Sequence, residues 1–225
     1  RREGFVAGLF FVAALPLVDG LEYQPHNIAM IVIISMLLIR RDWLKGLSFG
    51  IGLSFVQYTA FGLIPLMYLF AKSDESIVDR LSSFTVGSLV PIAGSFTVVG
   101  VIWGAESVIK GIFWSYLVVP GYILGLTDAN PAPGASSTFS PLKQPLFAVD
   151  TLLSVAIPLA YILLPAFLFG IITITEERSL KEDRLHTIAA IALLVPFIVR
   201  VFPHYWILSL PFLSILGARF YNRLL

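Results

Sequence analysis

The segment that decides the fold is residues 4–41, which read GFVAGLFFVAALPLVDGLEYQPHNIAMIVIISMLLIRR. Two apolar runs flank one polar turn; Arg1-Arg2 precede the segment and Arg40-Arg41 end it. Each arm between the arginine pairs has about 19 residues, which reach about 28 Å as a helix. A hydrocarbon core is about 30 Å thick. The segment therefore predicts two antiparallel membrane-crossing helices, with the turn at or slightly inside one boundary.

The composition extends this prediction to the whole chain. Hydrophobic residues make up 57% of the sequence and charged residues only 13%, with a mean hydropathy of +0.88. A soluble domain carries about 25% charged residues, whereas an apolar exterior costs nothing in lipid. Cysteine is absent and the net charge is +1, which excludes thiolate chemistry and gives no basic surface for nucleic acid. We expect an integral, multi-pass membrane protein.

Further apolar segments predict an all-α transmembrane bundle of about eight spans, forming a single domain over residues 1–225. For segment 107–126 two interpretations remain: a membrane-crossing helix, or a helix that lies at the membrane interface, which its charged and aromatic residues also suit. Residues 127–150 are rich in Pro, Ser and Gly and predict one long outer loop. The expected spans are 4–18, 23–39, 46–71, 83–103, 107–126, 151–175, 186–202 and 205–220.

Basic residues predict the orientation, because Lys- and Arg-rich loops stay cytoplasmic. Alternating spans with a cytoplasmic N-terminus place most of them on the inner side. We therefore expect a plasma-membrane protein with an inner N-terminus and an outer first turn. The inner set is Arg1, Arg2, Arg40, Arg41, Lys45, Lys110, Arg178, Lys181, Arg184, Arg219 and Arg223, and the outer set is Lys72, Arg80 and Lys143.

The first turn is the densest polar cluster of the chain and the first candidate site. Backbone that is not helical at membrane depth must line protein or a wet cavity. The turn therefore predicts a cavity-lining site, although a solvated turn would have the same composition. Its polar residues are Asp19, Glu22, Tyr23, Gln24, His26 and Asn27.

Two other polar groups extend the candidate site. Gln57 and Tyr58 interrupt the apolar run 46–71, and buried amides and hydroxyls need partners inside a bundle. Contacts that only join helices would explain them equally well. Near the last predicted turn, Arg200, His204 and Tyr205 meet the outer interface. A guanidinium matches phosphate oxygens, but an arginine at this depth also reaches the interface without any ligand.

Several other site classes lack their signatures. The sequence has no His-Glu-x-x-His pattern and no His pair at metal spacing, so a metal held by side-chain nitrogens is not predicted. Gly94-Ser95 lacks the second glycine of an intramembrane serine protease motif. No carboxylate stands near the middle of a predicted span, which argues against proton- or sodium-coupled transport.

Two stretches resemble the membrane-embedded glycosyltransferases of the GT-C superfamily, which use polyprenyl-phosphate sugars. The first begins with LPLVDGLEYQPHN at residues 15–27, continues to Arg40-Arg41, and includes Gln57-Tyr58 and Pro65. The second is FPHYW at residues 202–206, followed by LPF at 210–212 and Gly217-Ala218-Arg219. The order, spacing and orientation of the two stretches agree with the family pattern over roughly 40% of the chain.

The resemblance implies an inverting sugar transfer at the outer face. A carboxylate would act as general base on the acceptor hydroxyl, and cationic groups would stabilise the departing lipid phosphate. On this basis Asp19 and Glu22 are the candidate catalytic residues, with a divalent metal ion as a possible cofactor. Arg200 and His204 would bind the phosphate. The remaining candidates for donor binding are Tyr23, Gln24, His26, Asn27, Gln57, Tyr58 and Tyr205.

The chain also departs from the family pattern. The family's catalytic carboxylate lies in a first outer loop that would precede residue 4, and Val56 stands where the pattern has a lysine. We therefore expect either the C-terminal part of a longer enzyme or a divergent relative without its own base. A non-catalytic membrane subunit or scaffold is the main alternative. An uncoupled transporter is a second alternative, and it predicts a continuous polar path through the bundle.

Overall fold

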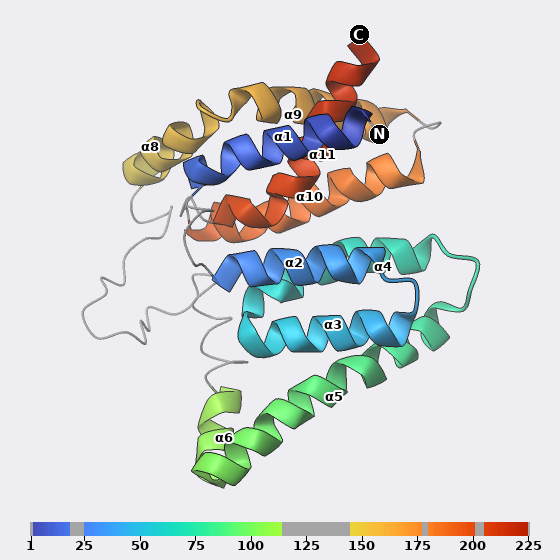
Figure 1. The fold of residues 1–225 in the computed structure, drawn as a ribbon, viewed down its shortest axis with the longest axis vertical. Helices are drawn as coiled ribbons and strands as arrows, with labels where there is room; N and C mark the ends of the chain where they lie inside the picture. The colour runs from blue at the N-terminus through green and yellow to red at the C-terminus, as the bar shows by residue number, and fades with distance from the viewer. Residues whose placement is uncertain (1, 19–24, 114–144, 177–179, 201–204, 225) are drawn as a thin grey trace.

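The computed structural model describes residues 2–18, 25–113, 145–176, 180–200 and 205–224 (Figure 1). Every regular element in these ranges is a helix, which confirms the all-α prediction. The α-helices are α1 (Arg2–Ala14), α2 (Pro25–Leu38), α3 (Asp42–Phe55), α4 (Leu63–Ala71), α5 (Ile77–Trp103), α6 (Ala105–Phe113), α8 (Pro145–Ala156), α9 (Ala160–Thr175), α10 (Lys181–Arg200) and α11 (Trp206–Leu224). Two short 3-10 helices, η1 (Leu15–Val18) and η2 (Gln57–Gly62), complete the fold.

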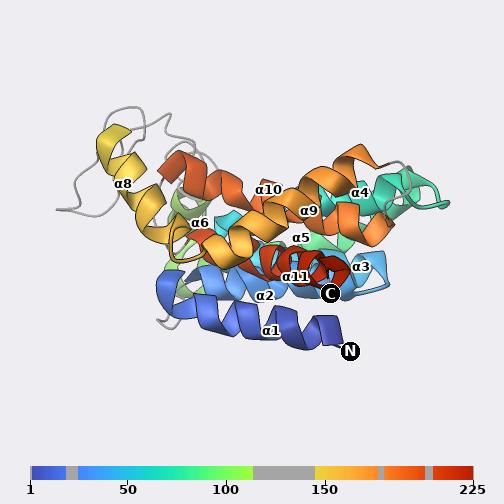
Figure 2. The ribbon, with the colours of Figure 1, turned by 90° about the horizontal axis from the view of Figure 1, so that it is seen from above.

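Helix α11 is the centre of the bundle. It packs against α1, α2, α9 and α10, and Figure 2 shows it between α1 on one side and α10 on the other. Its first five residues, 206–210, are all buried, as are most residues up to Ala218. A helix that is hydrophobic on all sides belongs in the interior of a bundle. The apolar pattern of residues 206–218 therefore explains why this helix forms the core.

Residues 46–71 form a hairpin, so the prediction of one continuous span there is wrong. Helix α3 ends at Phe55 and Val56 is extended; η2 contacts α3, and α4 runs back along the bundle next to α2 and α10 (Figure 1). Phe49 and Phe70 both lie against Phe84, with ring centroids 5.3 and 6.0 Å away. On one straight helix these two phenylalanines would be about 32 Å apart. The chain therefore enters and leaves this part of the bundle at the same end.

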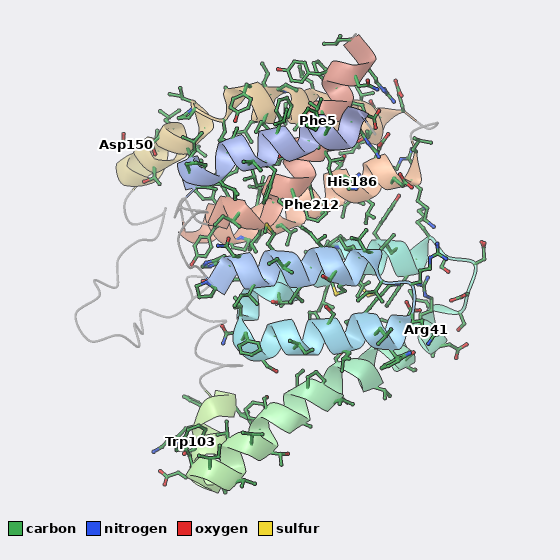
Figure 3. All side chains as sticks on the ribbon, viewed as in Figure 1. Phe5, Arg41, Trp103, Asp150, His186 and Phe212 are labelled. Carbon is green, nitrogen blue, oxygen red and sulfur yellow. The ribbon has the colours of Figure 1, made fainter. Side chains whose placement is uncertain are left out.

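An ion pair and a hydrogen bond correct the predicted sides of the charged loops. Arg80 binds Asp42, and the ammonium of Lys181 donates to the backbone carbonyl of Lys72. Lys72 and Arg80 therefore lie at the same end as Arg41, and their assignment to the opposite side is wrong. We call this the charged end; it also holds Glu3, Lys45, Glu176, Asp183 and Arg219, and Figure 3 shows Arg41 there and Trp103 at the far end of α5.

Two further predicted spans also differ from the structure. Helices α8 and α9 meet at an angle of 94°, so residues 151–175 are not one straight span. The described part of segment 107–126 belongs to α6, a nine-residue helix set off from α5 by Gly104. Residues 145–150 of the predicted outer loop are the first half of α8. The rest of both predictions, residues 114–126 and 127–144, lies outside the described residues.

Helix length gives a limited test of the membrane prediction. Among the described helices, α5 is long and apolar enough to cross a membrane. If the bent pair α8–α9 is taken as one span, the described residues contain two such spans. Residues 3–18, 25–38 and 57–71 form shorter apolar helices. These lengths are compatible with a membrane protein, and the eight-span arrangement stays a prediction.

Helices α3 and α5 pack with their backbones in direct contact, through glycines on both sides. A methyl group added at Gly46 would overlap the carbonyl oxygen of Phe84, and one added at Gly87 would overlap that of Trp43. At Gly50 it would meet Ser88 and Pro91. Glycines spaced four apart allow such close approach between membrane helices. This contact fixes α5 against the α3–α4 hairpin.

Candidate functional site

Three segments that are far apart in the sequence bring aromatic side chains together at the end of the bundle opposite the charged end. The ring of His26 lies 4.8 Å from the rings of both Tyr58 and Tyr205, measured between centroids. The two tyrosine rings are 5.0 Å apart, and their hydroxyl groups are hydrogen-bonded at 2.5 Å. We call His26, Tyr58 and Tyr205 the aromatic cluster, and its end of the bundle the cluster end.

Local sequence features place each member of the cluster. Pro25 is the first residue of α2, where its fixed φ angle suits a helix start, and it sets His26 in the first turn. The extended Val56 breaks α3 and turns Tyr58 back towards the bundle. Tyr205 directly precedes the buried helix α11. His26 and Tyr205 are only 6% and 4% exposed, so the cluster is part of the interior.

The cluster unites three residues that the sequence analysis had proposed from three separate segments. Asn27 follows His26 and Gln57 precedes Tyr58, and both are half-buried beside it in the chain. Arg200 is the last residue of α10, and its side chain lies outside the described part. The other proposed site residues, Asp19, Glu22, Tyr23, Gln24 and His204, lie outside the described residues altogether.

An apolar groove of about 500 Å³ runs along α9, α10 and α11. At the cluster end it is lined by Ala160 and by Trp206, the neighbour of Tyr205 in the chain. It extends to Ile174 and Thr187 near the charged end. The groove therefore runs along α9, α10 and α11, and Trp206 is the lining residue that adjoins the aromatic cluster in the sequence.

The sequence analysis missed this groove. Small residues line it: Ala166 and Gly170 are spaced four apart on α9, Ala160 is the first residue of α9, and Ala156 ends α8. Ala190 on α10 faces them across the groove. Such spacing places small side chains on one face of a helix, and this pattern was the available signal.

The charged end is held by an ion-pair network that the sequence analysis also missed. The guanidinium of Arg80 binds both carboxylate oxygens of Asp42, at 2.7 and 3.0 Å, and Lys45 binds the same carboxylate at 2.7 Å. Arg80 also stacks on Phe70, 4.5 Å from the ring centroid. A two-pronged, partly buried pair of this kind is strong for an ion pair. It ties the start of α3 to the start of α5.

Stability should depend on pH through Asp42. Hydrogen bonding to Arg80, with a smaller effect from Lys45, holds the pKa of Asp42 below its ordinary value of 3.8 despite partial burial. The stabilisation is therefore present above about pH 4 and is lost as the pH falls through the lowered folded-state pKa. Asp42→Asn should cost about 1–3 kcal/mol at neutral pH, and this cost should shrink in acid. Thermal unfolding of both proteins from about pH 7 to about pH 3 measures it.

The control for this prediction is Asp74→Asn, which changes an exposed carboxylate in the neighbouring loop. It should leave the stability and its pH dependence unchanged. A constant difference between Asp42→Asn and the original protein at every pH would contradict the prediction, because it would trace the cost to packing and not to charge.

The described residues give no metal site: no group of three or more His, Asp or Glu side chains among them could hold a metal ion. The divalent metal considered above would depend on Asp19 and Glu22, which lie outside the described residues. The comparisons with known proteins add no family, since no family model, curated protein or solved structure matches the chain.

Proposed function

We propose that this chain is a multi-pass membrane protein that binds a lipid-phosphate-linked sugar at the cluster end, as a member or relative of the GT-C glycosyltransferases. The observation that carries the proposal is the position of the apolar groove. One of its lining residues, Trp206, directly follows Tyr205 of the aromatic cluster in the chain, and the other lining residues follow α9, α10 and α11 towards the charged end. Such a site suits a ligand with a long apolar chain and a polar head.

Exposed apolar surface supports the membrane placement. Helix α5 has 27 residues, which reach about 40 Å, and only 11% of its apolar window is buried inside the protein. The core helix of a soluble protein would be mostly buried. Phe5 and Val12 on α1 are exposed as well. Continuous apolar surface of this kind requires lipid or another protein to cover it.

The distribution of charge supports an orientation. Basic residues gather at the charged end, and basic loops stay cytoplasmic, so we place the charged end inside and the cluster end outside. Lys110 on α6 then belongs to the outer side, where the sequence analysis had not put it. The basic residues at the charged end are Arg40, Arg41, Lys45, Lys72, Arg80, Lys181, Arg184, Arg219 and Arg223.

The groove and the cluster divide the ligand between them. The chain of a polyprenyl lipid moves into the groove from the bilayer and not from water, so it gains little hydrophobic free energy there. The groove would therefore select the chain by shape, and the contacts of the polar head would supply most of the affinity. Arg200 ends α10 at the cluster end, where a guanidinium suits the phosphate. The sugar would then lie near the aromatic cluster, with Asp19 and Glu22 as the proposed groups that act on the acceptor.

A non-catalytic membrane subunit that binds the same lipid is the second candidate. The groove favours it, because lipid binding there needs neither Asp19 nor Glu22. An uncoupled transporter has less support: in the described part of the chain, the interior around α11 is packed with apolar side chains such as Leu193, Leu208 and Leu216. A polar path would have to avoid this core.

Filling the groove should block lipid binding. Ala160→Trp puts a large ring at the groove entrance beside Trp206. We expect it to reduce photocrosslinking of a photoreactive polyprenyl-phosphate hexose about tenfold, which corresponds to about 1.4 kcal/mol of binding free energy. Ala93→Trp is the matched control, because Ala93 is exposed on α5 and does not line the groove. Equal labelling of the two variants would contradict the proposed site.

Sugar transfer tests the catalytic part separately. Asp19→Asn, Glu22→Gln, Arg200→Gln and His204→Gln should each lower hexose transfer from the same donor by about a hundredfold or more, the lower end of what one general acid–base or charge-stabilising group contributes. Transfer is followed by the loss of label from the donor lipid. Two results would favour the non-catalytic candidate. In the first, the original protein crosslinks to the donor lipid and yet shows no hexose transfer; in the second, it shows only transfer that none of these substitutions reduces.

A further inference from the structure

Helix α6 changes the direction of the chain immediately after α5. Gly104 separates the two helices with a φ angle of +84°, a conformation that L side chains rarely adopt. Helix α6 then packs back on the last turns of α5, with Val108 against Gly100 and Gly111 against Phe96 (Figure 1). A fixed turn and a packed interface hold this short helix in place at the end of α5.

The two exposed faces of α6 differ in polarity. With successive residues 100° apart, Ile109, Ile112 and Phe113 share one face, and they are 67%, 44% and 53% exposed. Glu106 and Lys110 share an adjacent face, about 90° further round the helix, where they form an ion pair of 2.7 Å between exposed side chains. The apolar face has no described helix over it, because the main neighbour of α6 is α5. The helix therefore suits a boundary between water and an apolar medium.

The depth of α6 follows from the length of α5. A helix of 27 residues exceeds a hydrocarbon core of about 30 Å by several residues, so its last residue, Trp103, lies at the interface. Trp103 is itself exposed, and tryptophan is enriched at this level of a membrane. Because α6 begins two residues later, it starts at the depth of the lipid headgroups.

We propose that α6 is an interfacial helix that lies in the outer leaflet boundary, with Ile109, Ile112 and Phe113 among the acyl chains and Glu106 and Lys110 in the headgroup water. Interfacial helices bury their apolar face about 5–10 Å into this boundary. A free helix of nine residues would bind a membrane weakly, but α5 keeps α6 at the surface. The proposal rests on the membrane placement of α5 and is independent of sugar binding.

The absence of cysteine from the chain allows a direct test with single spin labels. Ile109→Cys and Lys110→Cys are neighbours in sequence, but their side chains leave α6 about 100° apart, one on the apolar face and one on the charged face. In phosphatidylcholine vesicles, we expect the Ile109→Cys label to be more accessible to oxygen, which concentrates in lipid. The Lys110→Cys label should be more accessible to a water-soluble nickel chelate. Ile112→Cys and Glu106→Cys should repeat this contrast.

Val90→Cys, at an exposed position in the middle of α5, separates the possible failures. If its label is accessible to oxygen but the labels at Ile109→Cys and Lys110→Cys do not differ in their accessibility to the two reagents, the interfacial helix is wrong and the membrane placement stands. If the Val90→Cys label meets the nickel chelate instead, the membrane placement itself fails. A label at Ile109→Cys that is immobile and closed to both reagents would overturn the proposal in favour of a protein partner over this face.

Discussion

Gly46→Val should destabilise the protein by about 3 kcal/mol or more, or prevent it from folding. Overpacking in a tight core costs about 1–3 kcal/mol when side chains can move. Here the added carbon would overlap the backbone carbonyl of Phe84, and backbone cannot move aside without separating α3 from α5. Unfolding of the purified protein by sodium dodecyl sulfate in mixed micelles, followed by circular dichroism, would measure the loss.

Gly94→Val is the matched control, because it makes the same substitution on α5 where nothing lies within 4 Å of the added carbon. Its effect should stay within about 0.5 kcal/mol, as at other open surface positions. Equal stability of the Gly46→Val and Gly94→Val proteins would contradict the close contact between α3 and α5.

The sequence predicts the helices of this fold better than it predicts their paths. Apolar runs and their charged boundaries indicate α1, α2, α10 and α11 within a few residues. The hairpin at 46–71 was not predictable from the same signal, because its apolar run has no charged boundary in the middle. Its turn depends on tertiary contacts, such as the packing of Gly62 against Ile33 and Met36. Gln57 and Tyr58 marked the turn, but internal helix contacts explained them equally well.

The start of α1 and the end of α11 nevertheless lie at the same end of the bundle, as an even number of crossings requires, for a simple reason. Residues 46–71 run along the bundle twice where one span was predicted. Helix α5 ends at the cluster end, and α9 begins at that end too (Figure 1), so segment 107–126 adds no net crossing between them. The two errors cancel for the chain after residue 160. Among the basic residues that the structure describes, they misplace those that lie between the two errors, which are Lys72, Arg80 and Lys110.

The candidate site was predictable as a set of residues but not as a place. Polar side chains at membrane depth are few, which is why His26, Tyr58 and Tyr205 stood out in the sequence. Their meeting depends on the hairpin turn at Val56 and on α11 lying at the centre. The groove was harder still to predict. It exists because residues such as Ala160 and Gly170 have too little side chain to fill the space between helices, and the sequence does not show which helices lie around that space.

The second large effect should come from Arg219, which pairs with the buried Asp183 and lies 3.5 Å from Glu182. Asp183 is 2% exposed. Arg219→Met would leave its carboxylate buried without its cation, and breaking a buried pair from one side costs about 3–5 kcal/mol. Asp183→Leu should cost less, because the guanidinium of Arg219 still reaches Glu182 and, at 3.9 Å, Glu3. The same denaturation assay measures both variants.

The double variant Asp183→Leu/Arg219→Met separates charge from packing. Replacing both members of a buried ion pair with apolar side chains is often neutral or stabilising, so we expect it to be more stable than Arg219→Met alone. That recovery would show that the cost of Arg219→Met comes from the uncompensated carboxylate. Additive losses in the double variant would contradict this view. They would mean that Arg219 stabilises the junction of α10 and α11 mainly through the packing of its side chain.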